Sequence, residues 1–301
     1  MSEKGVRMYQ KRTAVTLLGT AVILIFFSVS CQPSQPAASP SEPPSASATA
    51  VQPSPSASAA GMLSNVKLCP ACHGEYTVVA GDKTCPAEPV NCPAADPRVR
   101  PLPPQAIDEA KFESLQKEWG LTGLRTPPES LGGLKPALAL AQGQKFQCES
   151  GNGLAMIGGL GGFCKILLTE QGGKTVQINT PEAFRKIFAP VESTEEALAF
   201  ATALTTATPL YEFDKRAMSS RDFGMIDLRP EFRYFSTSFV PTTVVKEGEN
   251  YRVNLFDFQQ FGCGPHPHYA VSYRVSSAGE VSEISRVKLF EDPNLDGLCV
   301  D

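Results

Sequence analysis

Histidine, tryptophan and the short motifs of common enzymes are scarce in this 301-residue sequence, which holds three His and one Trp. A Ser-His-Asp or Cys-His hydrolase therefore has few ways to assemble, and no GxSxG segment occurs. The GGKT segment at residues 172–175 looks like the end of a phosphate loop, but Leu168 stands where that loop requires glycine. We therefore predict no catalytic residues and a protein that is not an enzyme.

The sequence also has no surplus of positive charge. It contains 27 Lys and Arg residues and 31 Asp and Glu residues, which give a formal net charge of −4. Four of the basic residues lie at the start of the chain: Lys4, Arg7, Lys11 and Arg12. Removal of this leader would therefore make the net charge of the protein more negative. A chain of this charge is not expected to bind nucleic acid.

The start of the sequence has the pattern of an export signal. These four basic residues precede an uncharged run at 14–30, AVTLLGTAVILIFFSVS, which is the order of charged and apolar regions in a signal peptide. The run has 17 residues, fewer than the roughly 20 that a membrane-spanning helix needs. We therefore predict export from the cytoplasm.

The end of this run, SVSC at residues 28–31, resembles the lipobox of bacterial lipoproteins, although Ser28 stands where Leu is usual. The resemblance implies that residues 1–30 are removed and that lipid on Cys31 binds the membrane. An uncleaved signal anchor, or cleavage further along the chain, remains open. Because Gln32 stands where Asp would favour the inner membrane, the resemblance implies a lipid-anchored, extracytoplasmic location at the outer membrane or cell surface.

Residues 31–61 are Ser, Pro and Ala at most positions, with Glu42 as the only charged residue. Such a segment has little bulky apolar surface to bury, so we predict a disordered tether that follows the acylated Cys31. Frequent proline favours extended conformations of about 3.1 Å per residue, which gives a reach on the order of 90 Å. The folded part would then begin near Met62, well away from the lipid.

Nine cysteines occur, and setting Cys31 aside leaves the even number of eight. In an oxidising extracytoplasmic compartment this predicts up to four disulfides. Distance along the chain favours two later pairs and one N-terminal group of four, in which Cys69 and Cys72 each reach a later cysteine because pairing them together would close too small a loop. The later pairs are Cys148 with Cys164 and Cys263 with Cys299, and the group comprises Cys69, Cys72, Cys85 and Cys92.

Residues 62–104 contain that group of four and eight prolines between Pro70 and Pro104, which predicts an irregular, disulfide-rich segment. Its CPACHG stretch resembles the haem attachment site of monohaem cytochromes c, and the resemblance implies haem c on Cys69 and Cys72 with His73 as an iron ligand. The Pro-rich surroundings argue against a haem, because they offer no helices to enclose it. Zinc on the four cysteines and a thioredoxin-like redox pair are further alternatives.

Two loops near the C-terminus carry possible metal ligands. GCGPHPH at 262–268 places His266 and His268 at a spacing that suits copper or zinc if a third ligand converges. DPNLDG at 292–297 matches the start of a calcium loop, with ligands Asp292, Asn294 and Asp296, but the sequence ends before the twelfth-position Glu. The simpler interpretation, a Gly/Pro turn and an exposed Asx turn, is favoured for both loops.

Hydrophobic periodicity predicts an α+β fold, with helices followed by an antiparallel β-meander over residues 105–301, either as a domain alone or as one domain with residues 62–104. The predicted helices cover 107–119, 181–188 and 193–204; the predicted strands cover 234–246, 251–261, 268–276 and 281–290, and a hairpin covers 165–179.

These features together predict a membrane-anchored extracytoplasmic lipoprotein whose disulfide-stapled domain binds or scaffolds an unidentified partner. One alternative is an electron-transfer lipoprotein that carries one haem c. A second alternative is a metal-dependent enzyme that uses His266 and His268.

Overall fold

The computed structural model describes residues 62–63, 65–87, 92, 98–148, 151–159, 162–211 and 229–300. The chain divides into two compact units, Met1–Pro53 and Ser54–Asp301, and every described residue belongs to the second. The expected signal peptide, Cys31 and the tether up to residue 61 therefore lie outside the described residues. Within the described part, no helix is long and apolar enough to cross a membrane.

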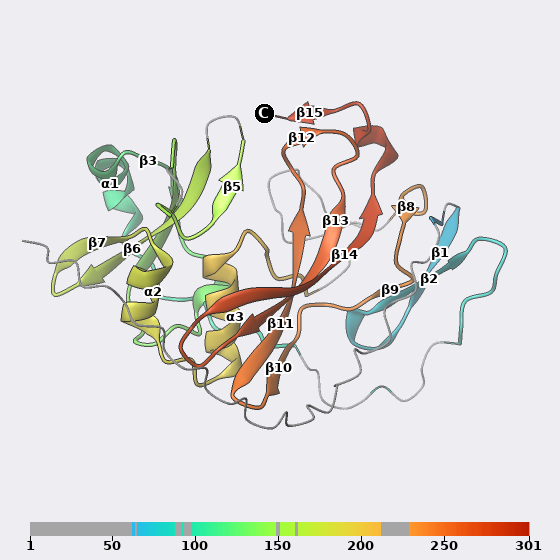
Figure 1. Cartoon of the computed structure of the whole chain (residues 1–301), viewed down its shortest axis with the longest axis horizontal. Helices are drawn as coiled ribbons and strands as arrows, with labels where there is room; N and C mark the ends of the chain where they lie inside the picture. Colours follow the sequence, from blue (N-terminus) through green and yellow to red (C-terminus); the bar gives the residue numbers. More distant parts are fainter. Residues whose placement is uncertain are drawn as a thin grey trace, which may run out of the picture. The chain divides into compact units, whose positions relative to one another are not determined.

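Antiparallel sheets dominate this mixed fold, and helices are few (Figure 1). The first five-stranded sheet has the order β3-β4-β6-β5, and β7 pairs with residues 167–171 of β6. In the predicted hairpin, β6–β7, Gly172 and Gly173 take positive φ angles of 57° and 76°, which a tight turn requires. The strands are β3 Leu121–Arg125, β4 Leu140–Lys145, β5 Met156–Gly158, β6 Phe163–Gln171 and β7 Lys174–Ile178.

Local capping signals explain where the helices begin and end. The first helix starts later than predicted, because Glu109–Lys111 form a 3-10 turn (η2) before it, and it ends at Gly120, whose φ is 62°. Ser193 and Glu196 form the predicted capping box of the third helix. The α-helices are α1 Phe112–Trp119, α2 Pro181–Phe188 and α3 Thr194–Leu204, with a further 3-10 turn, η3, at Glu129–Leu131.

The second five-stranded sheet contains the predicted meander and has the order β10-β11-β13-β14-β8. One long strand was expected at 234–246, and that prediction was wrong: three short strands occupy the region, and Pro241, which has no N–H to donate to a ladder, lies between the last two. The strands of this sheet are β8 Arg233–Tyr234, β10 Val244–Glu247, β11 Asn250–Phe258, β13 His268–Val275 and β14 Val281–Glu291. The third short strand, β9 Ser238–Phe239, belongs to a different sheet.

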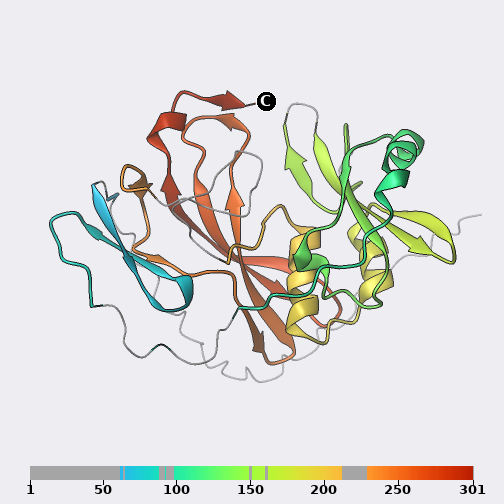
Figure 2. The same ribbon diagram turned by 180° about the vertical axis from the view of Figure 1, so that it is seen from behind.

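Helices α2 and α3 lie between the two large sheets, and Figures 1 and 2 agree on this arrangement. One apolar cluster includes Leu167 of the first sheet, Phe184 of α2, Phe200 of α3 and Val253 of the second sheet. Each of these side chains is fully buried. Because strands of the first sheet separate α1 from α2 along the chain, the predicted order of helices followed by a meander describes only the C-terminal half.

The N-terminal segment is more regular than the sequence suggested. Strands β1 Val66–Pro70 and β2 Tyr76–Ala80 form an antiparallel hairpin, and β2 also pairs with β9. Val66 and Val78 are buried in a second apolar cluster with Tyr234 and Phe290. The expectation of an irregular segment was wrong for this hairpin, because its apolar partners come from the C-terminal sheet.

Candidate functional site

The register of the second sheet brings the two predicted metal loops to one end of the molecule. β13 and β14 are antiparallel, and His268 at the start of β13 is the partner of Phe290 near the end of β14. The loop before β13 and the turn after β14 therefore meet. The segment that follows, with 3-10 turn η4 Pro293–Leu295 and strand β15 Cys299–Val300, folds back on β12 Gly262–Cys263.

His266 is buried and holds two chain segments together. It is only 2 % exposed, with a positive φ of 48°. Its Nδ1 lies 2.9 Å from the carbonyl oxygen of Gln259, and its Nε2 lies 3.0 Å from the carbonyl oxygen of Leu298. Both partners are carbonyl oxygens, which accept hydrogen bonds. A metal ion would have to displace one of these carbonyls.

His268 occupies a different environment, within a stack of aromatic rings. Its ring centroid lies 4.4 Å from that of Phe258 and 4.5 Å from that of Phe290. The Nδ1 atom is buried and has no hydrogen-bond partner. Burial lowers the pKa of His268 to about 4, because the apolar surroundings disfavour the charged ring. His266 and His268 are thus used separately, one in main-chain hydrogen bonds and the other in ring stacking.

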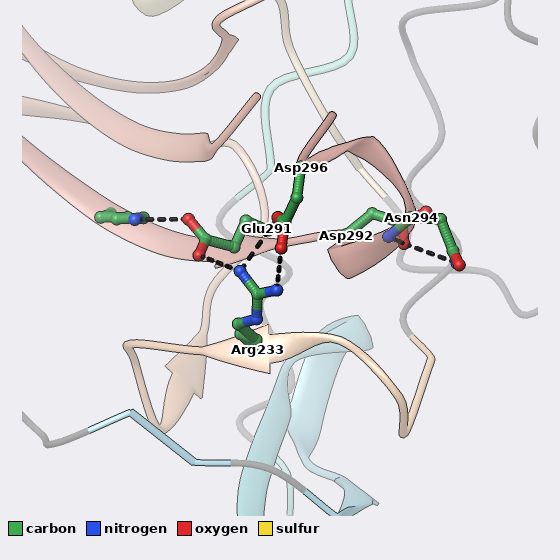
Figure 3. A network of polar contacts seen from close by, with 6 residues as sticks. Arg233, Glu291, Asp292, Asn294 and Asp296 are labelled. Atoms are coloured by element: carbon green, nitrogen blue, oxygen red, sulfur yellow. Dashed lines mark hydrogen bonds and ion pairs between the residues drawn. The ribbon is translucent and has the colours of Figure 1, made fainter. Parts of the chain in front are cut away.

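The three predicted calcium ligands do not point their oxygens at one position (Figure 3). Asp292 Oδ1 accepts hydrogen bonds from the main-chain N–H and the Nδ2 of Asn294, both at 2.9 Å, and so caps η4 as an Asx turn. The carboxylate of Asp296 instead pairs with Arg233. Asp292 and Asn294 therefore form an Asx turn, which is what the simpler interpretation of this loop predicted. Asp296 forms an ion pair instead.

Arg233 is the centre of a polar network that the sequence did not reveal (Figure 3). Its Nη1 donates to Glu291 Oε1 at 3.1 Å and to Asp296 Oδ1 at 3.0 Å, while its Nη2 contacts Asp296 Oδ2. Lys288 Nζ lies 2.5 Å from Glu291 Oε2. The hydrogen bonds from Arg233 hold the pKa of Asp296 below its usual range. Two cations face two carboxylates, so the network is balanced in charge.

Four disulfides join the eight cysteines that the sequence predicted to be oxidised. They are Cys69–Cys85, Cys72–Cys92, Cys148–Cys164 and Cys263–Cys299. Cys69 and Cys72 each reach a later cysteine, and neither pairs with the other. The two thioether bonds of a haem c would require both of these disulfides to be broken, since each sulfur is already bonded.

His73 lies in the turn of the CxxCH motif, within the 3-10 turn η1 Cys72–Gly74. It has a positive φ of 55°, and its buried Nε2 has no hydrogen-bond partner. The His73 side chain is half-buried. Among the described residues, no group of three or more His, Cys, Asp or Glu side chains is arranged to hold a metal ion.

Lys165 is a buried charged residue that the sequence reasoning missed. It lies on β6 and donates from Nζ to the carbonyl oxygens of Thr202, at 2.7 Å, and Thr205, at 2.5 Å, at the C-terminal end of α3. Burial, with a smaller contribution from Arg125, lowers the pKa of Lys165 to about 8. A lysine inside the apolar run CKILL was the available signal, because such a lysine must find buried acceptors.

An open groove of about 630 Å³ lies beside the β6–β7 hairpin and α2. Its lining includes the apolar residues Leu138, Val176 and Ile187 together with Glu170 and Lys186. Glu170 is already in an ion pair with Lys111, at 2.7 Å. The lining thus offers apolar contact surface with a charged border, and it contains neither His nor Cys.

The chemistry at the end of the second sheet is that of a cross-linked, charge-balanced structural region, with His266, Arg233 and one disulfide joining segments distant in sequence. Comparison with protein-family models, curated proteins and solved structures found no match for this chain.

Proposed function

We propose that the chain is an exported lipoprotein, acylated at Cys31, whose disulfide-stabilised part is a binding or scaffolding domain without a catalytic role. Residues 31–61 tether this domain to the outer membrane or cell surface. The observation that carries the proposal is the cysteine count: the four disulfides use eight of nine cysteines, and the ninth is Cys31 of the SVSC segment. Disulfides persist in oxidising compartments, which supports export.

The side chains that could perform chemistry also support a binding role over catalysis. His266 is engaged by two carbonyls, His268 is stacked between phenylalanines, and Lys165 is held by the end of α3. A general base needs an accessible lone pair within reach of a substrate proton, and none of these three groups presents one in this arrangement.

Membrane fractionation of Cys31→Ala tests the proposal. The wild-type protein should sediment with membranes and yield an N-terminal lipopeptide by mass spectrometry, whereas the variant should be released or remain unprocessed. The double variant Cys263→Ser/Cys299→Ser is the matched control, because it also loses cysteines but should stay in the membrane fraction. Unchanged sedimentation of Cys31→Ala, with no lipid on the wild type, would contradict the proposal.

The same purified protein distinguishes this proposal from the haem alternative. A covalent haem on Cys69 and Cys72 would colour the purified protein and survive denaturation, and it would appear as a modified peptide spanning residues 69–73. We expect a colourless protein in which non-reducing peptide mapping links Cys69 to Cys85 and Cys72 to Cys92.

A further inference from the structure

The last described residues are attached to the rest of the fold by a very short ribbon. β12 and β15 are each two residues long, and their register pairs Gly262 with Val300 and Cys263 with Cys299. An isolated two-stranded ribbon of this size is not stable in water. The Cys263–Cys299 disulfide, which spans 36 residues of sequence, joins one of the two residue pairs of this ribbon covalently.

Few other contacts hold this segment. The carbonyl oxygen of Leu298 accepts hydrogen bonds from Gly264 N–H at 3.2 Å and from His266 Nε2 at 3.0 Å, and Asp296 pairs with Arg233. The side chain of Leu298 is 44 % exposed, and residues 296–299 are all exposed. Apolar burial therefore contributes little to docking, and the disulfide is the main restraint.

The Cys263–Cys299 bond is also the most accessible of the four disulfides. Both of its half-cystines are exposed. Each of the other three includes a buried or half-buried half-cystine, and two of these, Cys69 and Cys164, are 1 % and 0 % exposed. Thiol–disulfide exchange requires a thiolate to approach a sulfur atom in line, so an exposed bond is the one most open to attack.

We propose that Cys263–Cys299 is a redox latch: a dithiol reductant opens it selectively, and residues 297–300 then leave the surface and uncover His266. Release removes the Leu298 carbonyl from Nε2 of a ring that is 2 % exposed in the closed form. The stack of His268 on Phe290 stays in place, because the β13–β14 ladder holds it. The latch does not depend on acylation of Cys31.

The redox step is a two-electron exchange. One thiolate of the dithiol attacks a sulfur of the disulfide and forms a mixed disulfide, and the other cysteine leaves as a thiolate. The second thiol of the reductant then resolves the mixed disulfide. The reductant departs as an intramolecular disulfide, and Cys263 and Cys299 remain as two thiols once protonated. A disulfide of the same class of carrier closes the latch by the reverse reaction.

Selective reduction of the folded wild-type protein tests the proposal. Dithiothreitol is added without denaturant, free thiols are alkylated at intervals, and peptides are mapped by mass spectrometry. Cys263 and Cys299 should be labelled first, while the other six cysteines stay bonded. Hydrogen exchange of the same sample should show loss of protection at residues 297–300, with the β11–β13 and β13–β14 ladders unchanged.

Two double variants complete the test. Cys263→Ser/Cys299→Ser should reproduce the exchange pattern of the reduced wild type without any reductant. Cys148→Ser/Cys164→Ser removes a different disulfide and should leave residues 297–300 protected. Earlier labelling of any other cysteine pair, or equal protection of residues 297–300 in the oxidised and reduced wild type, would overturn the latch; both readouts apply even if a variant fails to fold.

Discussion

The imidazole of His268 lies nearly parallel to the ring of Phe290, at 4.5 Å between centroids and 14° between planes. Phe258 covers the other face at 4.4 Å, and Phe290 in turn stacks on Phe232 at 5.2 Å. The stack joins β11, β13 and β14 to Phe232, the residue that precedes β8, at the end of the sheet. A charged imidazolium in this position would lose its hydration without gaining a counter-ion.

Acid should therefore destabilise the protein through His268. The pKa of His268 is lowered from 6.5 to about 4 in the folded state, so the unfolded chain binds this proton at a higher pH than the folded chain. The free energy of unfolding should fall as pH decreases from about 6.5 to about 4, by on the order of 3 kcal/mol from this group. His268→Phe keeps the stack and should lose this dependence in denaturant titrations at several pH values. Identical pH profiles for the variant and the wild type would refute the assignment.

Lys165 should likewise make the free energy of unfolding depend on pH, in this case at alkaline pH. Its pKa is lowered from 10.5 to about 8 by burial, so the unfolded chain again binds more protons between these values, and stability should rise with pH across that window. The difference in unfolding free energy between the wild type and Lys165→Met should change by on the order of 3 kcal/mol from pH 8 to pH 10.5. Lys174→Met controls for the loss of one lysine in the same hairpin. A constant difference would count against the burial of a charged Lys165.

Removal of the tether should leave the domain folded. A chain that begins at Met62 lacks residues 1–61 and should show the same unfolding midpoint as the longer chain. Limited proteolysis of the full protein should cut first within residues 32–61 and leave a stable fragment that starts near Met62. Protection of that segment, or a truncated protein that unfolds at lower denaturant, would show that the tether is part of the fold.

Loss of the Cys69–Cys85 bond should loosen the N-terminal hairpin first. This bond spans 16 residues, and loops of about that length contribute on the order of 3 kcal/mol. In Cys69→Ser/Cys85→Ser, amides of β1 and β2 should exchange faster while the β11–β13 ladder keeps its protection. His73→Ala is the control within the same motif and should leave the disulfides and the absence of colour unchanged. Equal loss of protection in β13 would mean that the hairpin and sheet unfold as one unit.

Local sequence patterns were enough to predict the elements whose stabilising contacts are close in sequence. The Ser193–Glu196 capping box and the Gly172–Gly173 turn depend on neighbours within a few residues, so their chemistry is visible in the sequence. The β1–β2–β9 sheet was missed because Tyr76 pairs with Phe239, far along the chain, and because the many prolines nearby suggested irregular backbone.

The roles of the candidate site residues were less visible from sequence. The H-x-H spacing identified His266 and His268 but could not show that one ring meets two carbonyls and the other two phenylalanines. Arg233 had no local signal at all, since its partner Asp296 lies 63 residues away. Packing decides whether a polar residue is free for chemistry or committed to structure, and packing here comes from distant segments.

The hairpin at the start of the folded part also has a mechanical consequence. A pull on the chain from its N-terminal side reaches Leu63 first, where two main-chain hydrogen bonds with Tyr234 resist it, and then the β1–β2 ladder. Hydrogen bonds can be broken one after another along such a ladder, but at Cys69 the load passes through a covalent bond to Cys85. The described part of the chain is therefore extended by only a few residues before the force meets this bond.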